Sequence, residues 1–139
     1  MTYSVPVRGS QMRAARCRWL VGPGSWDVRA RVERFDEPAL LLLLRDDERH
    51  GYELADAMGE LIPDGRRVDL GNLYRLLRGL EGEGVVESEW RADLPGPTKR
   101  TYQLTELGEE LLDQWAVALR RVDETIAGFL RRYEQRRRA

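Results

Sequence analysis

Three polar side chains with strong hydrogen-bonding groups recur at intervals of three residues in the middle of this sequence. They are Asn72, Arg75 and Arg78. An arginine guanidinium can bind guanine through two parallel hydrogen bonds, and an asparagine amide can bind adenine in the same way. On a helix, residues three apart lie on one face, so this spacing could present all three groups to DNA. The alternative interpretation is an ordinary solvated helix face, and DNA contact is favoured by the segment that follows.

The helix that would carry these side chains is predicted over residues 69–81, where leucines form the opposite stripe. Gly82 and Gly84 then follow and are typical of a left-handed C-cap. VVESEW and TYQL alternate apolar and polar residues around a turn containing Pro and Gly, which predicts a two-stranded wing over residues 85–104. Trp90, at the end of the first strand, is expected in the core.

Further groups that could contact DNA flank this helix. Lys99 and Arg100 lie beside the hairpin tip, where adjacent positive charges suit phosphate or minor-groove contact, although they could merely keep the loop soluble. Tyr52 and Tyr74 could each pack in the core or donate a hydroxyl to a phosphate. Arg66 and Arg67, just before the helix, are weaker candidates for phosphate contact.

Two shorter helices are predicted upstream. The first begins near Asp36, where two acids and a proline are typical of a helix N-terminus, and ends near Asp46. DDERHG is interpreted as a connection in which His50 is solvated, and YELADAMGELI predicts the second helix. Three helices followed by a hairpin form a winged helix-turn-helix, in which the third helix enters the major groove. The expected fold is mainly α with a small β-hairpin wing.

A long C-terminal helix is predicted from Thr105, an expected N-cap, through apolar residues spaced three and four apart. Its length exceeds what a small three-helix core can cover, so a second copy of the chain is expected to bury the excess. For Trp115, packing in this interface is favoured over lining a cavity for an aromatic effector. The residues assigned to the dimer interface or effector pocket are Leu111, Trp115, Leu119, Val122 and Ile126.

The charge distribution supports this division of the chain. Residues 1–35 hold seven arginines and two acids, residues 36–104 hold nine basic and fifteen acidic residues, and residues 105–139 hold seven of each. We therefore expect a basic and partly flexible N-terminal extension with a short helix around residues 10–20, a DNA-binding domain over 36–104, and a dimerisation helix with a basic tail over 105–139. The extension and the tail could add salt-sensitive affinity for DNA.

Several function classes are made improbable by composition. Cys17 is the only cysteine and His50 the only histidine, so no metal site, cofactor or catalytic nucleophile with its base is expected, and the chain is not expected to be an enzyme. The longest apolar run, ALLLLL, is too short to cross a membrane. MTYSVPVRGS does not form the apolar region of a secretory signal, which favours a cytoplasmic protein.

Three stretches in this order resemble the PadR family of bacterial transcriptional regulators. They are LLLLLRDDERHGYELADAM, LYRLLRGLEGEGVVESEW and GPTKRTYQLTELGEELL, and they cover about residues 38–115. The resemblance implies a homodimeric repressor that binds a palindromic operator on double-stranded DNA and is released by a small-molecule effector in many members. The alternative from another class is a winged-helix module that binds an acidic protein and has no preferred DNA site.

Overall fold

The computed structural model describes residues 18–28, 30, 32, 34–62, 69–92, 96 and 98–138. The chain divides into two units, Met1–Glu33 and Arg34–Ala139. The first contains an antiparallel hairpin of β1 (Arg18–Gly22) and β2 (Ser25–Val28). The helix expected around residues 10–20 is therefore wrong over 18–20, and its remainder lies outside the described residues. Apolar residues that favour strands flank a Pro-Gly turn here, which selects a hairpin.

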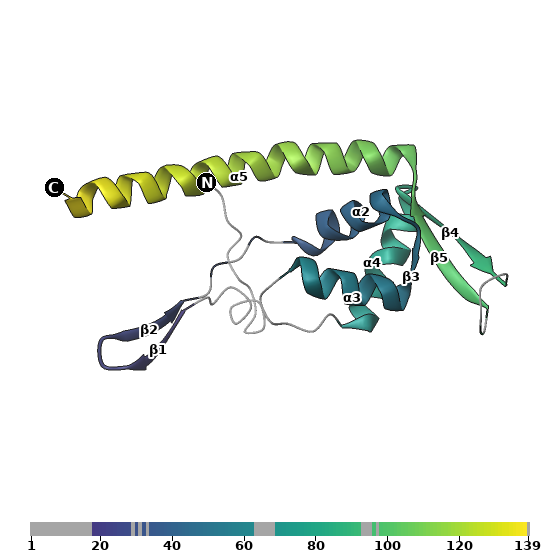
Figure 1. Ribbon diagram of the computed structural model, residues 1–139, viewed down its shortest axis with the longest axis horizontal. Helices are drawn as coiled ribbons and strands as arrows, with labels where there is room; N and C mark the ends of the chain where they lie inside the picture. Colours follow the sequence, from purple (N-terminus) through teal and green to yellow (C-terminus); the bar gives the residue numbers. More distant parts are fainter. Residues whose placement is uncertain are drawn as a thin grey trace. The chain divides into compact units, whose positions relative to one another are not determined.

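The second unit has the predicted order of three helices, a hairpin and a long helix (Figure 1). Its elements are α2 (Asp36–Asp46), β3 (Arg49–His50), α3 (Gly51–Leu61), α4 (Leu70–Gly82), β4 (Val86–Arg91), β5 (Lys99–Leu104) and α5 (Glu106–Arg138). The winged-helix prediction is thus confirmed. The short strand β3 was not predicted, because its two residues were expected in the connection DDERHG.

The core of this unit lies where α2, α3 and α4 meet the wing and the start of α5. α3 and α4 contribute residues three or four positions apart, as their sequence patterns predict, whereas α2 also buries consecutive residues at 39–41. Burying one such leucine side chain stabilises the fold by about 1.5–3 kcal/mol. The most deeply buried large side chains are Leu40, Leu41, Leu54, Met58, Leu77, Leu80 and Val86.

The connection from α4 to the wing is fixed by backbone hydrogen bonds. Val85 N donates to Leu80 O at 3.1 Å and Gly84 N donates to Glu81 O at 3.0 Å. Gly84 has a φ of +82°, which a side chain would disfavour, so the predicted left-handed cap is confirmed. The chain therefore turns directly from the end of α4 into β4.

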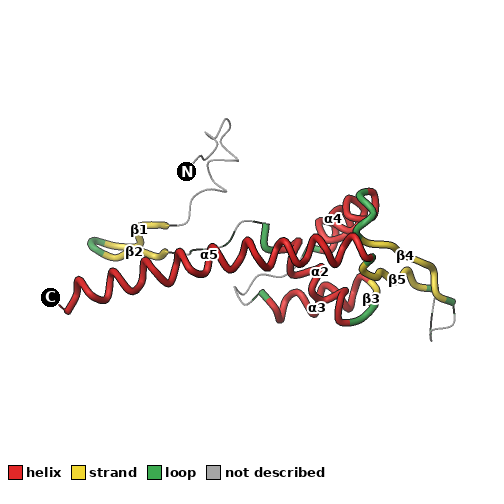
Figure 2. Tube along the Cα trace, turned by 90° about the horizontal axis from the view of Figure 1, so that it is seen from above, coloured by secondary structure: helices red, strands yellow, loops and turns green. Residues whose placement is uncertain are grey.

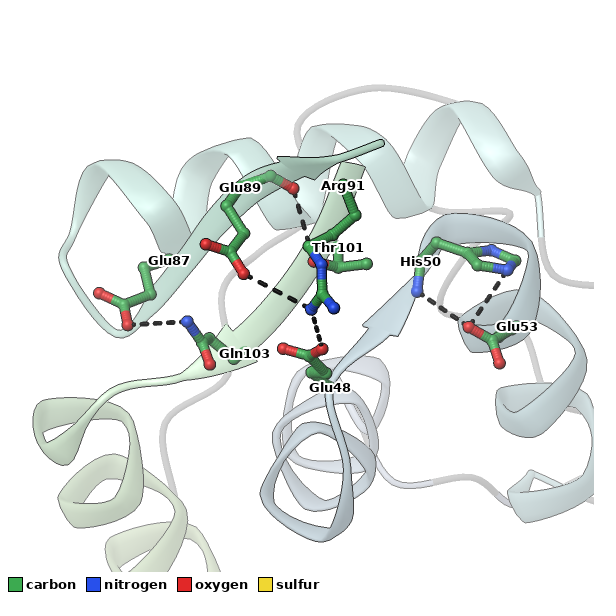
Figure 3. Close-up of polar contacts among 8 residues, drawn as sticks. All are labelled: Glu48, His50, Glu53, Glu87, Glu89, Arg91, Thr101 and Gln103. Atoms are coloured by element: carbon green, nitrogen blue, oxygen red, sulfur yellow. Dashed lines mark hydrogen bonds and ion pairs between the residues drawn. The ribbon is translucent and has the colours of Figure 1, made fainter. Parts of the chain in front are cut away.

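The sheet has the order β3-β5-β4, with both pairs antiparallel. Figure 3 shows Arg91 of β4 between Glu48 and Glu89, at 2.6 Å and 3.7 Å from their carboxylate oxygens. Gln103 Nε2 also donates to Glu87 Oε1 at 3.1 Å across the two wing strands. The wing is thereby joined to the segment before α3 as well as to α4.

Trp90 is 66% exposed, so its expected place in the core is wrong. Val86 and Ser88, on the same face of β4, are buried and half-buried. Trp90 lies two residues beyond Ser88, further along the protruding hairpin. At that point the helices no longer cover the strand. Its ring instead lies 5.8 Å from the guanidinium carbon of Arg100.

Candidate nucleic-acid interface

The outward face of α4 carries the three predicted polar side chains. Asn72, Arg75 and Arg78 are all exposed, while Leu73 and Leu77 on the opposite face are buried. Arg75 Nη2 donates a hydrogen bond to Asn72 Oδ1. Within the described part of the chain, the Arg78 guanidinium has no hydrogen bond or ion pair. The face can therefore present two guanidinium groups and one amide to a ligand without losing core contacts.

The first turn of α3 lies against this helix. Tyr74 of α4 is half-buried and its ring packs on Gly51, where an added Cβ would lie 2.6 Å from Tyr74 Cζ. A glycine is therefore required for this close approach rather than only for entry into α3. The next residue, Tyr52, is 67% exposed. The contact therefore joins α4 to the start of α3, next to the exposed Tyr52.

His50 is not simply solvated, contrary to the expectation from its polar surroundings. It ends β3, and only 19% of its side chain is exposed. Its Nε2 lies 3.2 Å from Glu53 Oε1, and its backbone N–H donates to the same oxygen at 3.2 Å (Figure 3). Glu53 thus occupies the first turn of α3, where a carboxylate is favoured by the helix dipole. This arrangement fixes the residue that precedes Gly51 and Tyr52.

The two basic residues of the wing differ in their surroundings. Lys99 is half-buried opposite Arg91, and no hydrogen bond or ion pair engages its ammonium group among the described residues. Arg100, in contrast, donates from Nε to Ser88 Oγ at 2.8 Å and from Nη2 to Glu81 Oε1 at 3.2 Å. Its side chain is directed to the end of α4. The structure therefore does not group Arg100 with the outward arginines.

Glu81 and Ser88 were not singled out in the sequence. Ser88 Oγ donates to Glu81 Oε2 at 2.6 Å, so both residues meet Arg100 at one place. Tyr102 is next to them, and burial raises the pKa of its phenol, although the positive charge of Arg100 opposes that change. The available signal was the motif LExxGxVxSxW, whose fixed spacing places Glu81 at the end of α4 and Ser88 on β4, across from the strand that carries Arg100.

Along α5, the five predicted interface residues fall into two groups. Leu111 and Trp115 pack against the core of their own chain, and Trp115 Nε1 donates to Glu37 Oε2 of α2 at 2.6 Å. Leu119 is half-buried, whereas Val122 and Ile126 are 39% and 49% exposed. The first pair therefore joins α5 to α2, and only the later residues present apolar surface to solvent.

Other predicted contacts lie partly outside the described residues. Arg66, Arg67 and Cys17 are among those that are not described. The basic residues near the end of α5 are described up to Arg137 and are exposed. None of the described helices is both long enough and apolar enough to cross a membrane.

Comparisons of this chain with known proteins indicate transcriptional regulators. Residues 40–114 match the model of the transcriptional regulator PadR-like family. A transcriptional regulator of Mycobacterium tuberculosis is 35% identical over 83 residues, which span 60% of this chain and 74% of the relative. The crystal structure of a PadR-like transcriptional regulator from Bacillus cereus is similar with a TM-score of 0.61 and 26% identity, covering 68% of this chain and 89% of that one.

One similar structure contains DNA. The crystal structure of Bacillus subtilis PadR in complex with operator DNA has a TM-score of 0.54 and 26% identity, and the similarity covers 62% of this chain and 49% of that one. The matched family segment begins within α2 and extends through α3, α4 and the wing to the first part of α5. This chain belongs to the PadR-like family of transcriptional regulators, and it is a regulator with a winged-helix fold rather than an enzyme.

Proposed function

We propose that the chain is a transcriptional repressor that binds a roughly palindromic operator as a homodimer. The observation that carries this proposal is the outward face of α4, where Asn72, Arg75 and Arg78 are exposed above a leucine-packed core. In a winged helix-turn-helix this helix enters the major groove. The operator complex of Bacillus subtilis PadR, a similar structure, supports the same use of the fold.

The wing and the start of α3 would add contacts to the DNA backbone. Lys99 can approach a phosphate, and the exposed hydroxyl of Tyr52 can donate to one. Tyr74 is held on Gly51, so its hydroxyl would reach DNA only at the edge of the interface. For Arg100, the contacts with Glu81 and Ser88 favour a different role.

A second copy of the chain would complete the repressor. Val122, Ile126 and Phe129 are spaced four and three residues apart on α5 and are all exposed in the single chain. This is the spacing of a helix pair that packs along one seam. Pairing there would hold the two α4 helices about one helical turn of DNA apart, ~34 Å, and would require a palindromic site.

Selection of bound fragments from genomic DNA tests the proposal. We expect a preferred site that contains an inverted repeat, and Arg75→Ala should weaken binding to it by about 1–3 kcal/mol while leaving the dimer intact. Arg45→Ala removes the same charge from an exposed position on α2 and serves as the matched control. Equal enrichment of all fragments by the wild-type chain would instead favour a module that binds an acidic protein.

Repression and its release need separate measurements. A reporter gene placed under the selected site should be expressed more strongly when the chain is absent, and expression that falls would indicate an activator. A small-molecule effector can shift the dimer only by its difference in affinity between two arrangements. We therefore expect an effector to weaken operator binding in the same assay, and candidate metabolites can be screened for that effect.

A further inference from the structure

The end of α4 and both strands of the wing meet in one polar cluster, the α4–wing cluster, which consists of Glu81, Ser88 and Arg100. Four hydrogen bonds close it. Ser88 Oγ donates to Glu81 Oε2 at 2.6 Å, and Arg100 Nε donates to Ser88 Oγ at 2.8 Å. Arg100 Nη2 donates to Glu81 Oε1 at 3.2 Å and to Glu81 Oε2 at 3.5 Å. The three residues come from three different elements. The cluster therefore links α4, β4 and β5 directly.

Two aromatic rings restrict the same guanidinium. The Arg100 guanidinium carbon lies 5.8 Å from the ring centre of Trp90 and 5.9 Å from that of Tyr102. A guanidinium is planar and can stack on aromatic rings, so these neighbours limit the orientations that it can adopt. Each hydrogen bond that it then makes costs little additional conformational entropy. Arg100 is thus held in one orientation, directed to α4 and away from the hairpin tip.

We propose that the α4–wing cluster is a positioning site that fixes the angle of the wing relative to α4, and that Arg100 acts there instead of binding a DNA phosphate. The proposal rests on the DNA-binding function proposed above. The third strand, β3, pairs with β5 only at Thr101 and Tyr102, so the wing has two strands beyond that point. A two-stranded hairpin is marginally stable by itself, and a further link to α4 would help to keep the protruding part in a defined position. A binding surface built from two elements requires that their geometry be held before the ligand arrives.

Glu81→Gln gives opposite results under the two roles of Arg100. If Arg100 binds phosphate, removing the carboxylate releases a competitor and a negative charge, so DNA should bind more tightly. If the cluster positions the wing, the same substitution weakens specific binding despite the favourable charge change. Glu83→Gln is the matched control, because Glu83 is exposed just beyond α4 and its side chain has no hydrogen bond or ion pair among the described residues.

We expect Glu81→Gln to bind the selected fragment about fivefold more weakly than Glu83→Gln, a change of the size expected for a partly exposed ionic cluster. Ser88→Ala keeps every charge and should weaken binding in the same direction with a smaller effect. Thermal unfolding of each variant establishes that the fold is retained. Binding by Glu81→Gln that equals or exceeds that of Glu83→Gln would overturn the proposal.

A second measurement needs no DNA. Nitroxide labels at Gly79→Cys on α4 and Ala92→Cys after β4, in a Cys17→Ser background, report the distance between α4 and the wing. An added Cβ at Gly79 meets no atom within 4 Å, and Ala92 is exposed, so both labels are tolerated. Glu81→Gln should broaden the distance distribution and Glu83→Gln should not. An unchanged distribution would overturn the positioning role even in a chain that prefers no DNA sequence.

Discussion

The first part of α5, residues 106–115, and its remainder, residues 116–138, carry the same sequence pattern and have different surroundings. In the first part, Leu112 is buried and Trp115 donates a hydrogen bond to Glu37 of α2. In the remainder, Ile126 is 49% exposed and Phe129 is 69% exposed. Figures 1 and 2 both show α5 continuing beyond α2, α3 and α4.

A periodic apolar stripe therefore predicts which face of a helix is buried, but not what covers that face. In the first part of α5, Leu111, Leu112 and Trp115 pack in or against the core of their own chain. Among the apolar residues there, only Leu107, at its start, is largely exposed, at 50%. The remainder presents the same kind of residues without cover from the described part of the chain. A second copy, with the same stripe, is the partner that the proposed repressor requires.

The largest expected effect is on dimer formation. Ile126→Asp places a charge on the exposed stripe. Because the substitution occurs in both copies, we expect the dissociation constant of the dimer to increase by at least about a hundredfold. Analytical ultracentrifugation over a concentration series measures it. Thr125→Asp adds the same charge at the next position, off the stripe, and should change dissociation far less. Similar dissociation of the two variants would place the interface elsewhere.

Two glycine substitutions should have opposite effects in the two parts of α5. A Cβ added at Gly108 would lie 2.9 Å from Leu104 Cγ and would also overlap Val85 O, so Gly108→Ala should destabilise the fold by about 1–3 kcal/mol. At Gly128 the nearest atom is Arg131 Nη2 at 3.7 Å. Gly128→Ala should therefore stabilise the helix by up to about 1 kcal/mol.

Chemical denaturation measures both glycine variants. Equal destabilisation by the two would contradict the contrast between a packed first part of α5 and an open remainder.

The bond between Trp115 and Glu37 should have a moderate effect on stability. Trp115→Phe keeps an aromatic ring and removes the indole donor, so we expect a loss of about 1 kcal/mol. In the double variant with Glu37→Ala the two losses should not add, because each substitution removes one partner of the same hydrogen bond. Additive losses in the free energy of unfolding would show that the bond contributes nothing by itself.

The smallest expected effect concerns alkaline stability. Burial raises the pKa of Tyr102, so at high pH the unfolded chain releases the phenolic proton before the folded chain does. The stability from the neutral phenol is therefore full below about pH 10, the unfolded value, and is lost as the pH rises further. The free energy of unfolding of Tyr102→Phe should therefore fall less steeply with rising pH than that of the wild type.

Tyr133→Phe, in the exposed remainder of α5, is the control for the alkaline measurement. Identical pH profiles for the two phenylalanine variants would contradict a special environment for Tyr102.

Features set by neighbouring residues could be predicted from the sequence. The start of α5 is one example, because Thr105 Oγ1 accepts from Gly108 N at 3.1 Å as an N-cap should. The C-cap at Gly84 is another. The leucine stripe of α4 likewise predicted its buried face, since helical spacing alone decides which residues share a side.

Features set by distant residues could not be predicted. The two residues of β3 are too few to show a period, so only pairing with β5 makes them a strand. Trp90 has the alternation of a core residue, and Arg100 has the sequence position of a residue at the hairpin tip. The actual surroundings of both depend on how far the hairpin extends beyond the helices. For the candidate site, the sequence indicated the arginines of α4 correctly as exposed groups, but the local alternation of the wing did not indicate that Arg100 is directed to Glu81.

The binding of paired chains to DNA can be measured by titrating a selected operator fragment with the purified chain at several salt concentrations. We expect two chains per fragment and an affinity that falls steeply with salt, by about 0.9 in the log–log slope for each phosphate contacted. Loss of Arg78 should reduce affinity for that fragment more than loss of Arg45. One chain per fragment, or an affinity that does not change with salt, would contradict the proposed binding of DNA by paired α4 helices.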